Sequence, residues 1–355
     1  MKKTFLLTAM ICASILFVSC EKEPNIDPEV PEATTGVFVL NSGNFGSNDA
    51  SLAQYNPDTK VVTYGVFQSV NGQKLGDTAQ DMLIYGSKMY IAVYNSGVIF
   101  VTDRTGKILK EIKEEGRSPR YFTTYKGNVF VTYYEGYLAK IDTTSLSVMA
   151  SVKVGDNPEQ VKAANGKLYV ANSGGMHYPN YGKTVSVVNP AVMAVTKTLS
   201  VVDNPANIEV DSKGDVYLVS LGNYADILGT LQKIDSQTDV VTTVSDLPVS
   251  FITMGLNDKI YFVSSQYDAS WNLIADYYVY DALTETVTGK FITDGTSVSG
   301  PYSITADPVT GNVYLGTSDY VSTGDMYIFS ANGVLINKFD TGGINPIGCY
   351  FVTNK

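Results

Sequence analysis

The sequence predicts an all-β fold, a seven-bladed β-propeller, from three observations. A unit of about 40 residues repeats along the 355-residue chain, each copy reads as four short strands, and the two ends are complementary parts of one unit. The clearest copy spans residues 157–197. There, Asn157-Pro158 opens a first strand and Leu168-Tyr169-Val170 forms the core of the second.

An aromatic residue at the centre of the second strand marks each repeat. It recurs at Phe38, Tyr90, Phe130, Tyr169, Tyr217, Tyr261 and Tyr314. The start of the unit recurs at Pro119, Pro158, Pro205, Pro248, Pro301 and Pro346, with Ala79 in the remaining copy. Turn residues follow the third strand, and the strands are rich in Val, Ile, Tyr and Thr without helical periodicity. We therefore expect seven antiparallel sheets of four strands.

The ends of the chain predict how the ring closes. The repeat begins at Gly36 with a second strand, whereas residues 345–352 read as a first strand with no unit after it. We expect the C-terminal strand to complete the N-terminal blade, which leaves no unpaired inner edge. The predicted organisation is a signal peptide over residues 1–19, an acylated tether over 20–35 and the propeller over 36–355.

The N-terminus has the features of an exported lipoprotein. Two lysines precede an apolar run that ends at Val18 and is too short to span a membrane. Ser19-Cys20 resembles a bacterial lipobox, although Phe17 stands where Leu is more usual, so we expect acylation of Cys20 and a lipid anchor. A plain secretory signal is the alternative.

The segment after Cys20 indicates where the protein is anchored. Residues 21–32 are acidic and Pro-rich, which is typical of an extended tether. Acidic residues directly behind the cysteine resemble the signal that sends Bacteroidota lipoproteins to the extracellular face of the outer membrane. We therefore predict that location.

Charge and cysteine content exclude some classes. The net charge is -10, and it becomes -12 without Lys2 and Lys3, which argues against a nucleic-acid partner. Only Cys349 remains beside Cys12 of the signal and Cys20. No intramolecular disulfide is expected in the mature chain, and Cys349 is predicted to be a small buried core residue.

The long loops point to one face of the disc. Loops that join second to third strands, and loops between blades, emerge together, whereas the other turns are short, as at Lys126-Gly127. The longest predicted loops include residues 172–184, 220–230 and 264–277. Aromatic and amide side chains on all the loops of this face are the candidate ligand-binding residues. They are Asn44, Phe45, Tyr94, Tyr134, His177, Tyr178, Tyr181, Tyr224, Tyr267, Trp271 and Tyr320.

Such side chains suit a broad, flat ligand studded with amides or hydroxyls. The alternative is that some of these rings fold back over apolar loop residues such as Leu228. Catalysis finds little support, because the single histidine is accompanied by no Gly-x-Ser-x-Gly motif, so we predict a protein that is not an enzyme. Acidic loop positions lack calcium-loop spacing and read as solvated surface charge.

Two resemblances sharpen these expectations. Gly166-Lys167-Leu168-Tyr169-Val170, with Asn-Pro before inner strands, resembles the YncE-like propellers over residues 36–355. The acylated start at Cys20 and the opening over residues 36–46, GVFVLNSGNFG, resemble the surface-exposed vitamin B12-binding lipoproteins of gut Bacteroidota, the BtuG family. That opening is shared with other propeller lipoproteins of the phylum.

The second resemblance implies a function. It implies capture of cobalamin or cobinamide as a bound ligand, with no intrinsic cofactor, and transfer of that ligand to a TonB-dependent outer-membrane transporter. His177 is a candidate axial ligand of cobalt, or a hydrogen-bonding loop residue. Competing hypotheses are a surface glycan-binding propeller, an interaction scaffold without a small ligand, and a propeller hydrolase or lyase.

Overall fold

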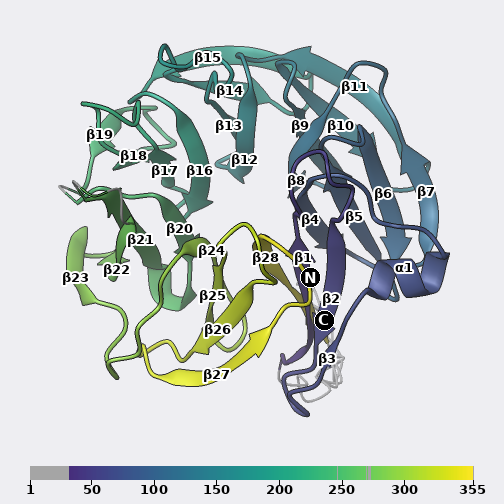
Figure 1. The fold of residues 1–355 in the computed structure, drawn as a ribbon. Coiled ribbons are helices and arrows are strands. Elements are labelled where there is room, and N and C mark those ends of the chain that lie inside the picture. Colours follow the sequence, from purple (N-terminus) through teal and green to yellow (C-terminus); the bar gives the residue numbers. More distant parts are fainter. Residues whose placement is uncertain (1–31, 246, 269, 271–272, 355) are drawn as a thin grey trace, which may run out of the picture. The chain divides into compact units, whose positions relative to one another are not determined.

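The computed structural model describes residues 32–245, 247–268, 270 and 273–354. The predicted signal peptide, Cys20 and Trp271 lie outside the described residues, so the expectations placed on them stay predictions. The described chain forms seven four-stranded antiparallel sheets arranged around an axis, as Figure 1 shows. The predicted seven-bladed β-propeller is confirmed.

The blades are numbered from the N-terminus and their strands run from the axis outward. Blade 1 contains β28 (Pro346–Thr353), β1 (Thr34–Asn41), β2 (Ser51–Tyr55) and β3 (Val62–Thr63). Blade 2 contains β4 (Ala79–Tyr85), β5 (Lys88–Val93), β6 (Val98–Asp103) and β7 (Ile108–Ile112). Blade 3 contains β8 (Pro119–Tyr125), β9 (Asn128–Tyr133), β10 (Tyr137–Asp142) and β11 (Ser147–Lys153). Blade 4 contains β12 (Pro158–Ala164), β13 (Lys167–Asn172), β14 (Thr184–Asn189) and β15 (Ala194–Ser200).

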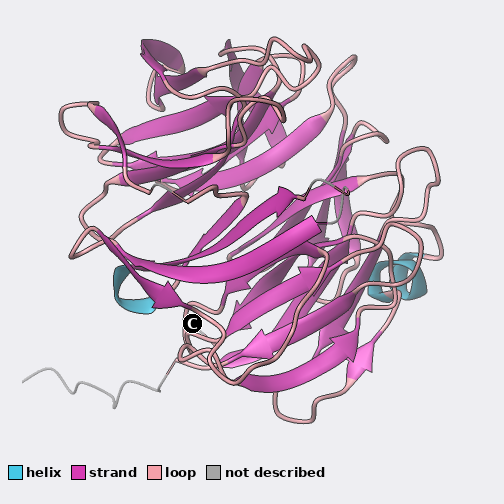
Figure 2. Ribbon diagram, turned by 60° about the vertical axis from the view of Figure 1, so that its left-hand side comes forward, coloured by secondary structure: helices cyan, strands magenta, loops and turns pink. Residues whose placement is uncertain are grey.

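The remaining blades follow the same order. Blade 5 contains β16 (Pro205–Val210), β17 (Val216–Ser220), β18 (Thr230–Ile234) and β19 (Val241–Thr243). Blade 6 contains β20 (Phe251–Met254), β21 (Lys259–Tyr267), β22 (Leu273–Asp281) and β23 (Thr286–Lys290). Blade 7 contains β24 (Pro301–Ala306), β25 (Val313–Thr317), β26 (Asp325–Phe329) and β27 (Leu335–Asp340). Strands dominate the described chain, and the two short helices lie at its edges (Figure 2).

The ring closes as predicted. β28 pairs with β1, with Phe38 opposite Tyr350 and Val39 opposite Cys349. Each inner strand also packs against the inner strands of both neighbouring blades, including β28 against β24 and β4. Cys349 is buried, as expected, and burial raises the pKa of its thiol well above its ordinary value.

The hydrophobic core lies between adjacent blades and depends on the repeated second strand. The aromatic centres of all seven second strands are no more than 3 % exposed. They lie on β1, β5, β9, β13, β17, β21 and β25. Because alternate residues of a strand point to opposite faces, each sheet contributes apolar side chains to the clusters on both of its sides.

Four features differ from the sequence-based expectation. β1 begins at Thr34, two residues early, because Thr34 pairs with Thr353 of β28; its hydroxyl also donates to the buried Asp307 carboxylate at 2.8 Å. The inner strand of blade 6 begins at Phe251, three residues after Pro248. The predicted loop over residues 264–277 is mostly a hairpin, because β21 and β22 stay paired from Ser264–Asp276 to Tyr267–Leu273. Two helices were also not predicted.

The longer helix, α1 (Val66–Asn71), covers the outer edge between blades 1 and 2. Its buried Val66 and Phe67 pack into the core shared by these blades, and the Asn71 amide donates to the Gly106 carbonyl at 2.8 Å. η1 (Leu256–Asp258) is a single turn between β20 and β21. Neither helix of the described chain has the length and apolar character needed to cross a membrane.

Candidate functional site

The loop face is built where second strands end and first strands begin. In six blades, the residue after the second strand donates its backbone N–H to the carbonyl just before the first strand. These pairs are Ser42–Asn345, Tyr94–Thr78, Tyr134–Ser118, Ser173–Asn157, Leu221–Asn204 and Ser318–Gly300. The two kinds of long loop are therefore tied together on one face, which carries the described candidate residues.

A cluster around Arg120 joins blades 2, 3 and 4. The rings of Tyr94 and Tyr134 pack edge to face with their centroids 5.5 Å apart. The Arg120 guanidinium lies 5.1 Å from the Tyr94 centroid and 4.6 Å from that of Tyr134. It also donates to the Gln80 amide oxygen at 2.6 Å and to the buried Glu159 carboxylate at 3.1 Å. Both tyrosine rings are therefore held in place before any ligand arrives.

Three further tyrosines continue this row of rings into blade 5. Tyr178 and Tyr181 have centroids 6.0 Å apart, and Tyr181 and Tyr224 are 5.9 Å apart, all in edge-to-face contact. The Tyr134 hydroxyl packs against Gly175 so closely that a Cβ there would lie 2.5 Å from it. The pair Tyr94–Tyr134 and the trio Tyr178, Tyr181 and Tyr224 thus meet where the Tyr134 hydroxyl lies against Gly175, and together they form one row. We call this row the aromatic arc.

Blades 7 and 1 supply a second group. Tyr320 packs edge to face on Tyr302, with centroids 5.8 Å apart. The Asn44 amide donates to the Tyr320 carbonyl at 3.0 Å and accepts from the Asn345 amide at 3.1 Å. Asn44 therefore holds the Tyr320 loop, because both ends of its side chain are engaged within the protein.

The other described candidates lie on the same face. Phe45 is 72 % exposed, and Tyr267, at the end of β21, is 62 % exposed. His177 is exposed in the loop between β13 and β14. The structure brings Tyr94, Tyr134, Tyr178, Tyr181 and Tyr224 together, but it leaves Phe45 and His177 outside these ring contacts.

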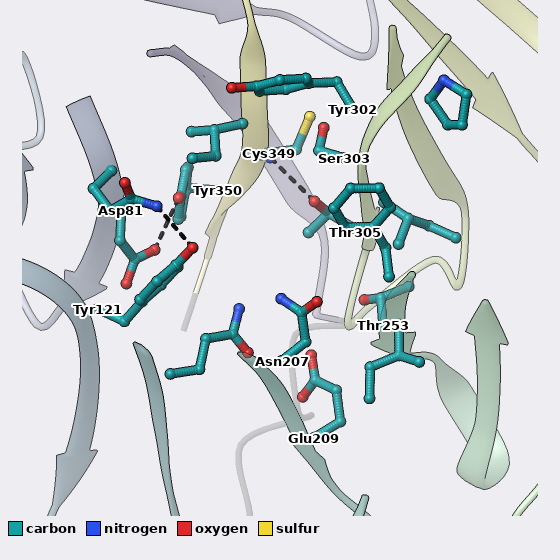
Figure 3. A pocket seen from close by; sticks show the side chains of 18 of the residues that line it. Asp81, Tyr121, Asn207, Glu209, Thr253, Tyr302, Ser303, Thr305, Cys349 and Tyr350 are labelled. Carbon is teal, nitrogen blue, oxygen red and sulfur yellow. Dashed lines mark hydrogen bonds between the residues drawn. The ribbon is translucent and has the colours of Figure 1, made fainter. Parts of the chain in front are cut away.

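A central cavity of about 410 Å³ is lined in part by Tyr302, which Figure 3 labels, and by Tyr320. Its wall carries Asp81 and Tyr121 on one side and Asn207 with Glu209 on another, as Figure 3 shows. Lys162 pairs with Glu209 at 3.0 Å. Asp81 accepts hydrogen bonds from the Tyr350 hydroxyl at 2.9 Å and the Phe122 amide at 2.8 Å. Burial outweighs these bonds and raises the pKa of Asp81 to about 6.

A second hollow lies between blades 5 and 6. It encloses about 690 Å³ and is lined mainly by apolar groups, including Leu221, Leu228 and Leu273. Tyr224, at the end of the aromatic arc, and Tyr267 stand on its two walls. The loop face therefore offers a polar cavity at its centre and an apolar hollow toward its edge.

The pKa values of two tyrosines on this face are raised above the ordinary value. Burial, and then the Glu159 carboxylate, raise the pKa of Tyr134 to about 12, and burial followed by Tyr320 raises that of Tyr302 to about 12. Both hydroxyls therefore stay protonated donors at neutral pH. Among the described residues there is no group of three His, Cys, Asp or Glu side chains placed to hold a metal ion.

Comparison with known proteins places the chain in a family. A family model described as Domain of unknown function (DUF5074) matches residues 35–344. The chain belongs to this family. No curated protein matches the sequence.

Solved structures similar to this DUF5074 protein share its fold at low sequence identity. A putative 6-phosphogluconolactonase from Bacteroides fragilis NCTC 9343 is 14% identical, with a TM-score of 0.64 over 90% of this chain and 98% of that one. A putative 6-phosphogluconolactonase from Bacteroides uniformis ATCC 8492 is 11% identical, with a TM-score of 0.64 over 90% and 100%. Kuenenia stuttgartiensis Hydrazine Synthase is 15% identical, with a TM-score of 0.61 over 75% and 89%. At these identities the likeness shows the propeller fold alone.

Sequence reasoning missed several residues at the mouth of the DUF5074 propeller. Gln80, Arg120, Glu159 and Tyr302 each follow directly after a unit start, at Ala79, Pro119, Pro158 and Pro301. The repeat itself carried the signal, because equivalent positions of a propeller lie at equivalent depths around the axis. Comparing that single position across the seven copies would have found them.

Proposed function

We propose that this protein is a cell-surface binding protein whose loop face captures a corrinoid such as cobalamin or cobinamide. The observation that carries the proposal is the aromatic arc together with Tyr302 and Tyr320, which border a central mouth lined by amides and paired charges. In this proposal Cys20 carries the lipid anchor at the outer membrane, and the ligand passes to a TonB-dependent transporter, as the family resemblance implies.

The chemistry of the surface suits such a ligand. A corrin is a broad ring edged with amides, so it offers apolar area to stiff aromatic side chains and polar groups to their hydroxyls. Tyr94 and Tyr134 are already ordered by Arg120, which lowers the entropy cost of fixing them on binding. Protonated hydroxyls such as that of Tyr134 can donate to amide carbonyls.

The charges at the mouth favour a neutral ligand. Arg120 is paired with Glu159, and Lys162 is paired with Glu209, while Asp81 adds a further carboxylate. A phosphorylated substrate would need uncompensated positive charge. The paired charges therefore argue against a phosphosugar as the ligand of this chain, even though two structurally similar proteins are named as putative 6-phosphogluconolactonases.

A surface glycan is the second candidate. Tyr178, Tyr224, Tyr267 and Tyr320 are each more than 60 % exposed, and exposed ring faces of this kind stack well on sugar rings. The two ligand classes differ in the area they need. A corrinoid engages several blades at once, whereas a glycan can follow two or three neighbouring rings.

Titration of the purified protein with cyanocobalamin and cobinamide tests the proposal. We expect micromolar or tighter binding by calorimetry and a change in the corrin absorption bands. Tyr134→Ala should weaken corrinoid binding. Leu283→Ala, which removes an exposed apolar side chain on the opposite face, should leave corrinoid binding unchanged. A spectral shift that disappears in His177→Ala would assign axial ligation. Binding of neutral oligosaccharides without corrinoid binding would overturn the proposal in favour of a glycan.

A further inference from the structure

The polar side chains of the central cavity fall into two groups. Some are used to hold the blades together: the Ser303 hydroxyl donates to the Pro346 carbonyl at 2.7 Å, and the Thr253 hydroxyl accepts from the Ala306 amide at 3.0 Å. The Thr305 hydroxyl accepts from the Cys349 amide at 3.3 Å, as drawn in Figure 3. These groups have structural partners and need no ligand.

The second group faces the cavity with unused hydrogen-bonding capacity. Over the described residues, no hydrogen bond engages the Asn207 carboxamide or the Tyr302 hydroxyl, and both line the cavity. Gln160 uses its amide oxygen to accept from the Ile208 N–H at 2.8 Å, which leaves its NH₂ group unused. Half-buried polar groups of this kind gain from a bound partner that supplies both a donor and an acceptor.

The charged groups limit what that partner can be. Lys162 and Glu209 compensate each other, and the Asp81 carboxylate already accepts two hydrogen bonds. An anion would meet two carboxylates with a single cation between them, so a neutral group is favoured. The volume of about 410 Å³ admits a group of monosaccharide size, but it is at the low end for a complete drug-sized ligand.

We infer that the central cavity is a second binding site for a neutral carboxamide group, with Asn207 and Gln160 in its wall and Tyr302 at its mouth. A carboxamide places a donor and an acceptor side by side, which matches the donors and acceptors left unused around the cavity. Two sources could supply it: an amide side arm of a corrinoid bound above, which rests on the proposed function, or the N-acetyl group of a sugar. Tyr320 lines the cavity and also belongs to the exposed loop face, so one ligand can occupy both levels.

The test uses small probes that fit the cavity alone. Ligand-detected NMR would measure binding of propionamide and N-acetylglucosamine to the full chain, with glucose as the hydroxyl-only comparison and gluconate as the anionic one. We expect both amide probes to bind more tightly than glucose, and gluconate to bind least. Asn207→Leu should weaken amide binding by up to about tenfold, the effect expected of removing one half-buried hydrogen-bonding group.

Matched variants separate binding from folding. Tyr302→Phe removes only a hydroxyl and should weaken amide binding several-fold while the ring stays packed on Tyr320. Gln237→Leu removes an exposed amide from a turn of the same blade as Asn207, on the opposite face, and should change nothing. Amide binding that is absent in the wild type, or equal in wild type and Asn207→Leu, would overturn the inference.

The same proteins titrated with cyanocobalamin distinguish this inference from the proposed function. Amide binding lost in Asn207→Leu, without any corrinoid binding, would uphold the cavity site and reject the corrinoid. If the amide probes do not bind and Asn207→Leu leaves corrinoid binding unchanged, the corrinoid function is upheld and the cavity site is rejected. Loss of both ligands in Asn207→Leu, with an unchanged unfolding temperature, would identify the corrinoid arm as the source of the amide.

Discussion

On the face opposite the loop face, the turns after the third strands are closed by the residue that begins them. Asp142 accepts from the amides of Thr144 and Ser145, and Asp235 accepts from those of Gln237 and Thr238. On the loop face the comparable polar contacts join different blades, as when Arg120 bonds Gln80 and Glu159, 40 and 39 residues away. These turns are closed by neighbours in sequence, whereas the Arg120 cluster is held by neighbours in space.

This difference predicts a separation of roles. The turns of the opposite face stabilise the blades and, as in the Thr34–Asp307 hydrogen bond, their packing, whereas the Arg120 contacts on the loop face fix the relative positions of exposed rings. Changes on the loop face should therefore alter ligand binding more than stability, and changes on the opposite face should do the reverse. The experiments below test this separation, from the largest expected effect to the smallest.

The largest effect is expected from the double variant Tyr94→Ala/Tyr134→Ala. It removes two adjacent rings of the aromatic arc, each of which is expected to contribute about 1–2 kcal/mol to binding. Affinity for cyanocobalamin should fall about 30-fold or more by calorimetry. The urea midpoint should change little, because both side chains are only half-buried. A large loss of stability with unchanged affinity per folded molecule would contradict the separation.

Asp307→Ala should have the opposite effect: it should lower stability and leave ligand affinity nearly unchanged. Asp307, in the turn between β24 and β25, is 1 % exposed and accepts from the Thr34 hydroxyl at 2.8 Å and the Val309 amide at 2.9 Å. Its loss leaves buried donors without partners, which should cost about 2–3 kcal/mol of unfolding free energy in urea. Affinity for cyanocobalamin should stay within twofold. Asp307→Asn keeps an acceptor oxygen and should cost less; an equal cost would show that the charge, and not the hydrogen bonds, stabilises this turn.

The same contrast explains what the sequence could and could not predict. The buried aromatic centres, the ring closure and the turn residues follow from local pattern, because strand propensity and Asx turns depend on a few adjacent residues. The role of Arg120 could not be predicted, because its partners lie one blade away on each side.

Blade 6 shows a second limit. Ser264, Ser265 and Gln266 have no strong strand preference, yet they continue the ladder of β21 because Asp276, Ala275 and Ile274 lie opposite them. The pairing is decided by the partner strand and not by the segment itself. The helix α1 was missed for a related reason, because six residues carry too little periodicity to be detected before packing is known.

Asp81 lies between the two faces, on the inner strand of blade 2, and tests how the cavity behaves. Burial raises its pKa in the folded state to about 6 from an ordinary value of 3.8, so the folded protein binds this proton more tightly than the unfolded chain. The stabilising effect of that proton is present below pH 4 and is lost as the pH rises to about 6.

Relative to Asp81→Asn, the wild type should therefore lose up to about 3 kcal/mol of unfolding free energy between pH 4 and pH 7. Urea denaturation of both proteins at several pH values measures the difference. A difference that does not vary with pH would show that Asp81 stays ionised throughout, with the Tyr350 and Phe122 hydrogen bonds offsetting its burial. Corrinoid affinity measured over the same pH range would show whether ligand binding also depends on the protonation of Asp81.

The smallest effect is expected from Phe45→Ala, which tests where the binding surface ends. Phe45 is 72 % exposed and, unlike Tyr320, is in contact with no other aromatic ring of the described chain. Its removal should change the unfolding free energy by less than about 0.5 kcal/mol. Cyanocobalamin affinity should fall less than about threefold, as for a residue at the rim of an interface. A loss of tenfold or more would mean that the loop between β1 and β2 closes over the ligand, and blade 1 would then belong to the binding surface as fully as the aromatic arc does.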